Sequence, residues 1–124
     1  MSSMSSALGE LAADAGVERT TFLATAGDQL RRFMDANKNC YSKVTCPERF
    51  TLAGPPYDDV VPFARTVVER FPDRVLWGTD WPHPNMPKEA PDDGVLVDMI
   101  PKIAPTAALQ KQLLIDNPMR LYWT

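Results

Sequence analysis

Twelve prolines divide this 124-residue chain into short segments and limit where its helices and strands can lie. Proline has no backbone N–H, so it interrupts the interior of a helix and cannot donate a hydrogen bond within a central strand. Pro47 therefore ends one predicted strand, and Pro101 is expected to bend a later helix or to end it early. Four prolines at positions 82–91 predict a long irregular loop over residues 82–93.

The apolar residues between these prolines alternate between helical and strand spacing. Helices are expected over residues 28–37, from 58 to 71, from 92 to 103 and from 106 onward, with a last helical turn over Met119–Tyr122. Strands are expected over Cys40–Cys46 and Val75–Thr79, which are both predicted to be buried, and over Thr20–Leu23. This alternation is typical of an α/β protein with parallel strands.

Each predicted helix has a polar start and an apolar stripe for the core. Expected helix starts are Asp58 with Asp59, Asp92 or Asp93, Thr106, and Asn117 with Pro118. The side chains expected to face inward are Leu30, Phe33 and Met34; Val60, Phe63, Ala64, Val67, Val68 and Phe71; Val95, Leu96, Met99, Ile100 and Ile103; and Leu109, Leu113 and Leu114.

The composition excludes several classes of protein. The chain is 44% hydrophobic and 23% charged, as in an ordinary globular domain. A formal net charge of -3 and a pI of about 5.0 leave no basic surplus for nucleic acid. The sequence has no run of about 18 apolar residues that would span a membrane, and Met1–Ser6 lacks the features of a secretory signal. We therefore expect neither nucleic acid nor a membrane as a partner.

The cysteines and the single histidine bear on redox state and metal binding. Cys40 and Cys46 lie six positions apart, so within an extended strand their Cα atoms would be about 20 Å from each other. A disulfide cannot bridge that distance, and we expect two reduced, part-buried thiols in a cytoplasmic protein. One histidine, His83, and no Cys-x-x-Cys motif argue against a zinc site built from this chain alone, so no metal or cofactor is expected.

Two charged residues follow the ends of the two main predicted strands. Asp80 comes directly after Val75–Thr79, and Arg49 comes shortly after Cys40–Cys46. If the strands are parallel, both residues lie at the same edge of the sheet, which in an α/β barrel is the catalytic face. Asp80 has two interpretations: a general base that takes a proton from water, or a cap for the turn that follows.

Arg49 and His83 also have a functional and a structural interpretation each. The Arg49 guanidinium can hold a substrate carboxylate in a two-pronged fork, or it can pair with Glu48 or Asp58 in a solvated loop. His83 can donate a proton or orient a ligand, or it can be an ordinary surface histidine of a proline-rich loop.

Six stretches in a fixed order carry a family resemblance. They are Lys43–Arg49, Gly54–Asp59, Trp77–Met86, Pro91–Gly94, Ile103–Thr106 and Asn117–Trp123. Together they resemble the C-terminal part of the amidohydrolase-related (amidohydrolase 2) family, and within it the group of lactonases that opens 2-pyrone-4,6-dicarboxylate. The resembling part is residues 28–124, which we expect to be the C-terminal part of a barrel domain, and residues 1–27 form an unplaced N-terminal segment.

The resemblance implies a fold and an activity. The chain would be a C-terminal fragment of a (β/α)₈ TIM barrel, with about two to three parallel strands and flanking helices, because a whole barrel needs about 200–250 residues. The enzyme would be a hydrolase that opens a cyclic dicarboxylate ester with water and without a metal. Asp80 matches the family's general base, and Arg49 matches the arginine that binds a substrate carboxylate. His83 is a candidate accessory residue from its own position in the loop.

The chain departs from the family because the His-x-His pair of the first barrel strand is absent. The isolated chain is therefore expected to have little or no lactonase activity, and to self-associate through uncovered barrel edges. Two alternatives remain open. One is a metal-dependent amidohydrolase or decarboxylase relative in which Asp80 is a metal ligand, and the other is a non-catalytic truncated remnant that folds only with a partner.

Overall fold

The computed structural model describes residues 19–51, 53–86 and 89–123. Its elements, in chain order, are α2 (Arg19–Ala36), β1 (Ser42–Val44), η1 (Pro47–Arg49), α3 (Val61–Arg70), β2 (Val75–Trp77), α4 (Asp93–Asp98), α5 (Ile100–Ile103), α6 (Ala107–Lys111), η2 (Gln112–Asp116) and α7 (Asn117–Tyr122). Among these described elements, no helix is both long enough and apolar enough to cross a membrane.

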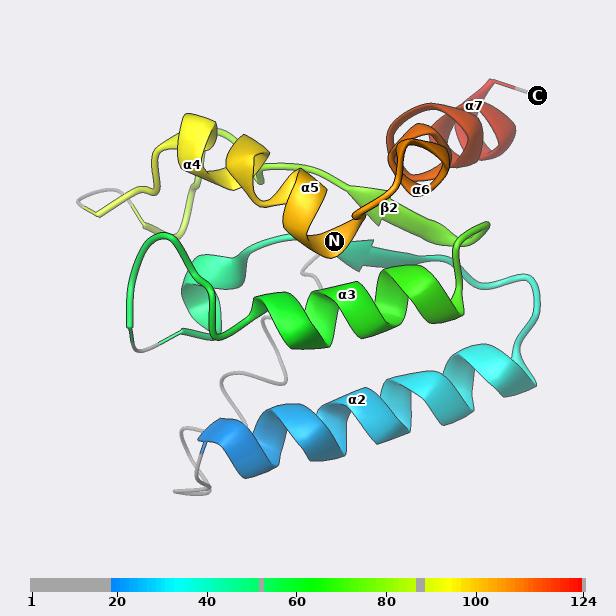
Figure 1. The fold of residues 1–124 in the computed structure, drawn as a ribbon, viewed down its shortest axis with the longest axis horizontal. Coiled ribbons are helices and arrows are strands. Elements are labelled where there is room, and N and C mark those ends of the chain that lie inside the picture. The colour runs from blue at the N-terminus through cyan, green and yellow to red at the C-terminus, as the bar shows by residue number, and fades with distance from the viewer. Residues whose placement is uncertain (1–18, 52, 87–88, 124) are drawn as a thin grey trace.

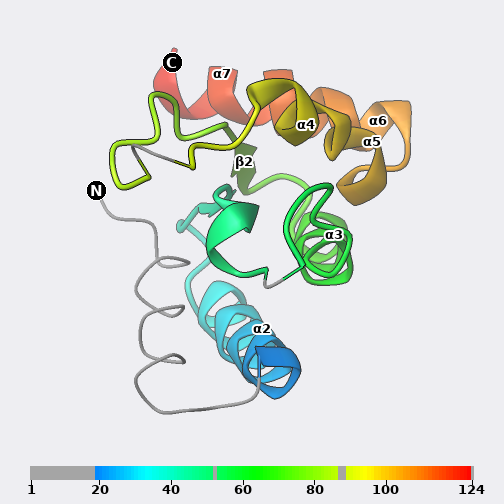
Figure 2. The ribbon, with the colours of Figure 1, turned by 90° about the vertical axis from the view of Figure 1, so that its left-hand side faces the viewer.

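The two strands and the helix between them form one β-α-β unit. β1 and β2 pair in parallel, with Ser42 opposite Val75 and Val44 opposite Trp77. Figure 1 shows α3 running along one face of the pair, with α2 outside it and the C-terminal helices on the opposite side. The turned view in Figure 2 shows the same separation of α2 and α3 from α6 and α7. This confirms the α/β class with parallel strands.

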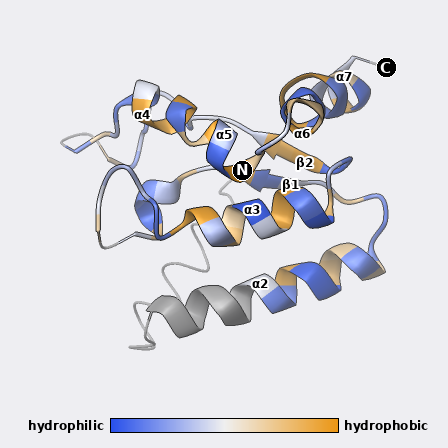
Figure 3. Cartoon of the chain, viewed as in Figure 1, coloured by the Kyte–Doolittle hydropathy of each residue, from blue (hydrophilic) through white to orange (hydrophobic). Residues whose placement is uncertain are grey.

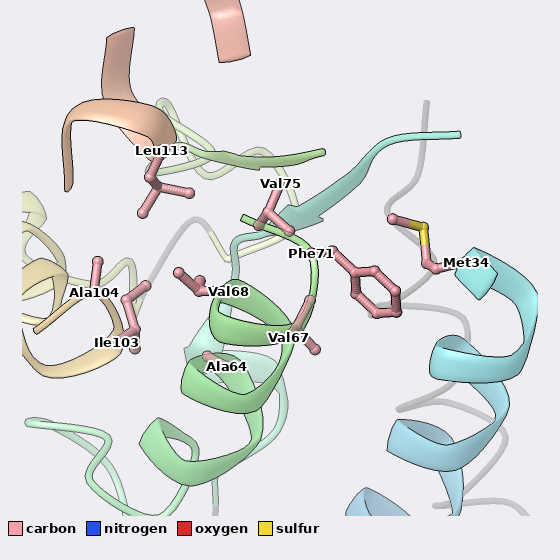
Figure 4. Close-up of a cluster of buried hydrophobic side chains, with 9 residues drawn as sticks. All are labelled: Met34, Ala64, Val67, Val68, Phe71, Val75, Ile103, Ala104 and Leu113. Atoms are coloured by element: carbon pink, nitrogen blue, oxygen red, sulfur yellow. The ribbon is translucent and has the colours of Figure 1, made fainter. Parts of the chain in front are cut away.

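The main core lies around α3 and β2. Its buried members are Met34, Ala64, Val67, Val68, Phe71, Val75, Ile103, Ala104 and Leu113, drawn in Figure 4. They come from α2, α3, β2, the end of α5 and η2, so the core joins the helices on both sides of the strands. The spacing of apolar residues in α3 predicted its inward face, and that prediction is confirmed at four of its core positions, Ala64, Val67, Val68 and Phe71.

The strands differ from the sequence prediction in length and burial. Each is only three residues long, and the predicted strand at Thr20–Leu23 is wrong because those residues lie in α2. β2 is apolar and buried at Val75 and Leu76, whereas β1 is polar and exposes Lys43 (Figure 3). The prediction that β1 is a buried strand is therefore wrong. Within the described residues β1 pairs only with β2, which leaves its other edge uncovered.

Several predicted helix starts and inward residues are corrected. The caps at Asp92 and Thr106 are confirmed, since their side chains accept hydrogen bonds from the backbone N–H groups of Gly94 and Leu109. At the start of α3 the cap residue is Val60, without a side-chain cap. The side chains of Asp58 and Asp59 instead bond Lys102 and Thr51, respectively. Phe33 and Leu114, predicted to face inward, are 45% and 41% exposed.

Asn117 has a different role from the predicted one. It is fully buried, and its Nδ2 donates to the backbone oxygens of Pro72 and Val75, at 2.8 Å each. It does not cap α7, because η2 runs into that helix without a break and no side-chain cap bond forms there. Pro101 behaves as predicted, since α4 ends at Asp98 and Pro101 lies in the first turn of α5.

Candidate functional site

The candidate site lies where both strands end. Because β1 and β2 are parallel and in register, the segments after Val44 and Trp77 leave the sheet at the same edge. Arg49 and Asp80, 31 residues apart in sequence, meet there: Arg49 Nη2 donates to Asp80 Oδ2 at 3.1 Å. The Arg49 side chain is 17% exposed and that of Asp80 is 34% exposed, so the pair is partly open to solvent.

The backbone at this edge is held in an unusual conformation. Cys46, Asp80 and His83 have φ values of 58°, 64° and 57°, in the left-handed region. For a residue other than glycine such a conformation costs about 1–3 kcal/mol of conformational free energy, so the surrounding contacts must stabilise it. Turn bonds do part of this, with Arg49 N–H donating to the Cys46 carbonyl at 3.1 Å and His83 N–H to the Asp80 carbonyl at 2.8 Å.

The contacts of Asp80 and Arg49 bear on the structural interpretations given above. The Trp81 N–H donates a hydrogen bond to the Thr79 hydroxyl at 3.2 Å, so Thr79 and not Asp80 accepts the turn bond from that N–H. The Asp80 carboxylate accepts instead from Arg49. Asp58, one suggested partner of Arg49, pairs instead with Lys102. The structure thus brings together the two residues that sequence reasoning singled out as base and carboxylate binder.

His83 is a buried residue, so its interpretation as a surface histidine is wrong. Its side chain is 4% exposed, and Nε2 lies 2.8 Å from Asp93 Oδ1 at the start of α4. Its other ring nitrogen, Nδ1, lies 4.0 Å from Glu48 Oε1. Within the described structure, Nδ1 has no hydrogen-bond partner.

Glu48 and Cys46 lie at the same edge, and sequence reasoning did not single them out as candidate site residues. Glu48 is 5% exposed at its side chain, and Oε2 has no hydrogen-bond partner within the described structure. Burial raises the pKa of the Glu48 carboxyl, and the nearby His83 and Arg49 oppose that shift only in part. Burial also raises the pKa of the Cys46 thiol, whose sulfur lies 3.2 Å from the Thr45 hydroxyl.

The signal that could have found both residues was their position. They lie beside Arg49 in the turn that follows β1. Only the arginine was considered as a binding residue, because its guanidinium matches a substrate carboxylate. Both cysteines are free thiols, as expected, with Cys40 half-buried and Cys46 buried. Two surface hollows, lined mainly by charged side chains of α2, α3 and the loops that follow them, contain none of the candidate site residues.

Comparison with known proteins supports the family resemblance. A family model described as amidohydrolase matches residues 26–123. The chain is 64% identical over 100 residues to a protein of Comamonas testosteroni named 2-pyrone-4,6-dicarboxylate hydrolase, covering 74% of this chain and 33% of that protein. It is 40% identical over 116 residues to a protein of Rhizobium radiobacter named 4-sulfomuconolactone hydrolase, covering 92% of this chain and 37% of that protein.

A solved structure shows the same fold. The apo crystal structure of ATU3138 from Agrobacterium tumefaciens matches with a TM-score of 0.64 and 29% identity, over 77% of this chain and 34% of that one. The chain thus spans about a third of the length of the curated relatives it matches. Its two parallel strands and their helices are part of a TIM barrel, and relatives are named lactone hydrolases. The chain belongs to the amidohydrolase family.

Proposed function

We propose that residues 28–124 supply the C-terminal strands and helices of a cytoplasmic lactone hydrolase that acts on a cyclic dicarboxylate ester such as 2-pyrone-4,6-dicarboxylate. The observation that carries this proposal is the Arg49–Asp80 pair at the carboxyl edge of two parallel strands. The names of the relatives support the reaction class. The two free cysteines agree with a reducing compartment.

In the proposed reaction Asp80 is the general base and Arg49 binds the substrate. A water molecule attacks the ester carbonyl while its proton passes to the Asp80 carboxylate. The tetrahedral intermediate then collapses, the ring C–O bond breaks, and Asp80 returns the proton to the leaving oxygen. A substrate carboxylate would compete with Asp80 for the Arg49 fork, so substrate binding would turn the aspartate toward water.

The test is a chimera in which residues 28–124 of this chain replace the matching C-terminal third of the Comamonas hydrolase. Loss of the ultraviolet absorbance of 2-pyrone-4,6-dicarboxylate reports the reaction. We expect the chimera to hydrolyse the lactone, and Asp80→Asn to lower kcat by about 10²–10⁴-fold. Asp116→Asn, which removes a carboxylate that pairs with Lys111 in the C-terminal helices, is the control and should retain the rate. An Asp80→Asn chimera as fast as the parent would refute the assignment.

The isolated chain should show little or no turnover in the same assay. The described part of its site edge brings together one proposed base and one arginine, and the chain spans only about a third of the length of its relatives. Turnover by the chain alone would contradict this part of the proposal. A chimera that folds but never turns over the lactone would favour the non-catalytic alternative.

We also propose that the reaction needs no metal. Adding a chelator to the chimera should leave its rate unchanged. A rate that a chelator abolishes and zinc restores would instead support the metal-dependent alternative, with Asp80 as a ligand.

A further inference from the structure

The loop that carries Asp80 has one buried side chain close to that residue. Among residues 81–86, only His83 is buried. Trp81, which lies between Asp80 and His83, exposes most of its ring to solvent. The position of this loop segment therefore depends on what holds the His83 side chain.

His83 is connected to Asp80 by the backbone of a tight turn. The His83 N–H donates to the Asp80 carbonyl at 2.8 Å, which closes a β-turn over the four residues 80–83. Both end residues have φ values in the left-handed region, 64° for Asp80 and 57° for His83. Because the turn is closed by this bond, a displacement of His83 would move the backbone from which the Asp80 carboxylate projects.

The His83 ring is held by the start of α4. Its Nε2 lies 2.8 Å from Oδ1 of Asp93, the first residue of that helix. A carboxylate only accepts hydrogen bonds, so Nε2 carries a proton and donates this one. On the other side of the ring, Nδ1 lies 4.0 Å from Oε1 of Glu48, which directly precedes Arg49. The ring thus lies between α4 and the turn that carries the proposed carboxylate binder.

This position gains importance when a substrate binds. In the structure the Asp80 carboxylate accepts from Arg49, the side chain that a substrate carboxylate would also claim. Once Arg49 turns to the substrate, the direction of the Asp80 carboxylate is set by the turn beneath it. A displacement of a catalytic group by about 1 Å can cost about 10²-fold in rate.

We propose that His83 is a positioning residue, whose hydrogen bond to Asp93 fixes the turn that directs Asp80 toward the attacking water. This inference rests on the proposed function, and it goes further because it gives the His83–Asp93 pair a part in the rate of proton transfer to Asp80. In this role His83 acts through the backbone and does not touch the substrate.

Ring-nitrogen NMR of the complete 124-residue chain tests the hydrogen bond without any need for catalysis. The chain has one histidine, so the ring signals belong to His83. We expect an Nε2–H proton that exchanges slowly with water, and its loss in Asp93→Ala. Asp93→Asn keeps an acceptor oxygen and is the matched control, which should retain the signal. A wild-type chain without this signal, or an Asp93→Ala chain that keeps it, overturns the proposal.

Kinetics of the chimera described above test the effect on Asp80. His83→Leu fills similar space without a donor, whereas His83→Gln places an amide donor near the position of Nε2. Both substitutes are unbranched at Cβ, so the left-handed backbone affects them alike. We expect His83→Leu to lower kcat by about 10- to 100-fold with little change in KM, and His83→Gln to recover most of the rate. Adding Asp93→Ala to His83→Leu should cause no further loss, because both remove the same bond.

A background without the base separates positioning from a general defect in structure. In the Asp80→Asn chimera, His83→Leu should slow the residual reaction by less than about twofold, because no carboxylate remains to be directed. A loss by the same factor in both backgrounds, or a parent that needs Asp80 but not His83, overturns this inference alone. An Asp80→Asn chimera as fast as its parent would refute the proposed function, and this inference with it.

Discussion

Three residues in left-handed conformation, Cys46, Asp80 and His83, occur where the two strands end. The Cys46 sulfur lies within 4.8 Å of a carboxylate oxygen of Asp80 and one of Glu48, and His83 Nδ1 lies 4.0 Å from Glu48 Oε1. Strain of this kind persists only where the surrounding structure holds it, and it collects at functional sites. At the scale of single residues, the strand-end turns are therefore where we propose that the chemistry lies.

Arg49→Ala tests the proposed carboxylate binder. A hydrogen bond to a charged group contributes about 1.5–3 kcal/mol, so the variant chimera should lose about 10- to 100-fold in kcat/KM, mainly through a higher KM. Steady-state lactone hydrolysis measures both constants. Arg65→Ala, which removes an exposed arginine paired with Glu69 on α3, is the control and should behave as the parent. A lower kcat with an unchanged KM would contradict substrate binding by Arg49.

Glu48→Gln tests the buried carboxyl through the pH dependence of stability. Burial raises the pKa of Glu48 in the folded chain. The stability that the protonated group contributes is present below the ordinary glutamate pKa of about 4.3, and it is lost as the pH rises through the raised folded value. In urea unfolding, the stability of Glu48→Gln relative to that of the wild type should therefore increase as the pH rises above about 4.3.

The control for this experiment is Glu69→Gln, which removes a half-exposed carboxylate on α3. It should show a smaller change with pH than Glu48→Gln, because solvent screens an exposed ion pair. A difference between Glu48→Gln and the wild type that shrinks as the pH rises would show that the charged carboxylate stabilises the fold.

At the scale of the elements, buried polar bonds join the C-terminal helices to the strands. Asn117 at the start of α7 donates to the carbonyls that precede and begin β2, those of Pro72 and Val75. Leu113 of η2 contributes the apolar part of the same contact, because it belongs to the core around Val75. The end of α3 and the strand that leads to Asp80 are thus fixed from the C-terminal side of the molecule.

Asn117→Ala should be strongly destabilising. It leaves two buried carbonyl oxygens without their donors and opens a small void, so we expect a loss of about 2–4 kcal/mol in the free energy of unfolding. Denaturant unfolding followed by circular dichroism measures it. Asn85→Ala, at an exposed position in the proline-rich loop, should change stability by less than about 0.5 kcal/mol. Equal effects at the two positions would refute the role of Asn117.

Sequence reasoning succeeded where a periodic pattern or a local cap determines the structure. The spacing of Ala64, Val67 and Val68 predicted the buried face of α3, and Thr106 was correctly predicted as a cap. Parallel pairing of the two main strands followed from their alternation with helices, and it brought Arg49 and Asp80 to one edge.

The failures involve contacts between residues far apart in sequence. Asn117 is a residue type that often caps helices. Its side-chain amide instead donates to backbone carbonyls 45 and 42 positions earlier in the sequence. The burial of His83 depends on Asp93 and Glu48, which lie in different turns. The exposure of Phe33 and Leu114 depends on which elements pack over α2 and η2, and helical periodicity does not encode that.

At the scale of the whole molecule, the chain exposes large apolar side chains near its C-terminal end. Leu114, Ile115, Met119, Leu121, Tyr122 and Trp123 are each 39–70% exposed. Within the described residues the sheet consists of β1 and β2 alone, so each strand also has an unpaired edge. Exposed apolar surface and open strand edges both favour association.

We therefore predict that the chain self-associates reversibly. Sedimentation velocity should show a mean mass that rises with protein concentration, and Trp123→Ser should shift this rise to higher concentration. Trp81→Ser is a matched control, because Trp81 is 74% exposed and Trp123 is 70% exposed, but Trp81 lies in the loop after β2. A chain that stays monomeric throughout, or equal effects of both variants, would contradict association through the C-terminal helices.

The β-α-β unit has a consequence for how such a site is inherited. Arg49, Asp80 and His83 lie in one uninterrupted stretch of sequence, residues 42–93, together with both strands, α3 and Asp93, the contact of His83. A recombination breakpoint outside this stretch transfers the base, its arginine and the buried histidine as a single genetic block. Their mutual geometry can therefore pass intact between genes whose remaining barrel strands, and whose substrates, have diverged.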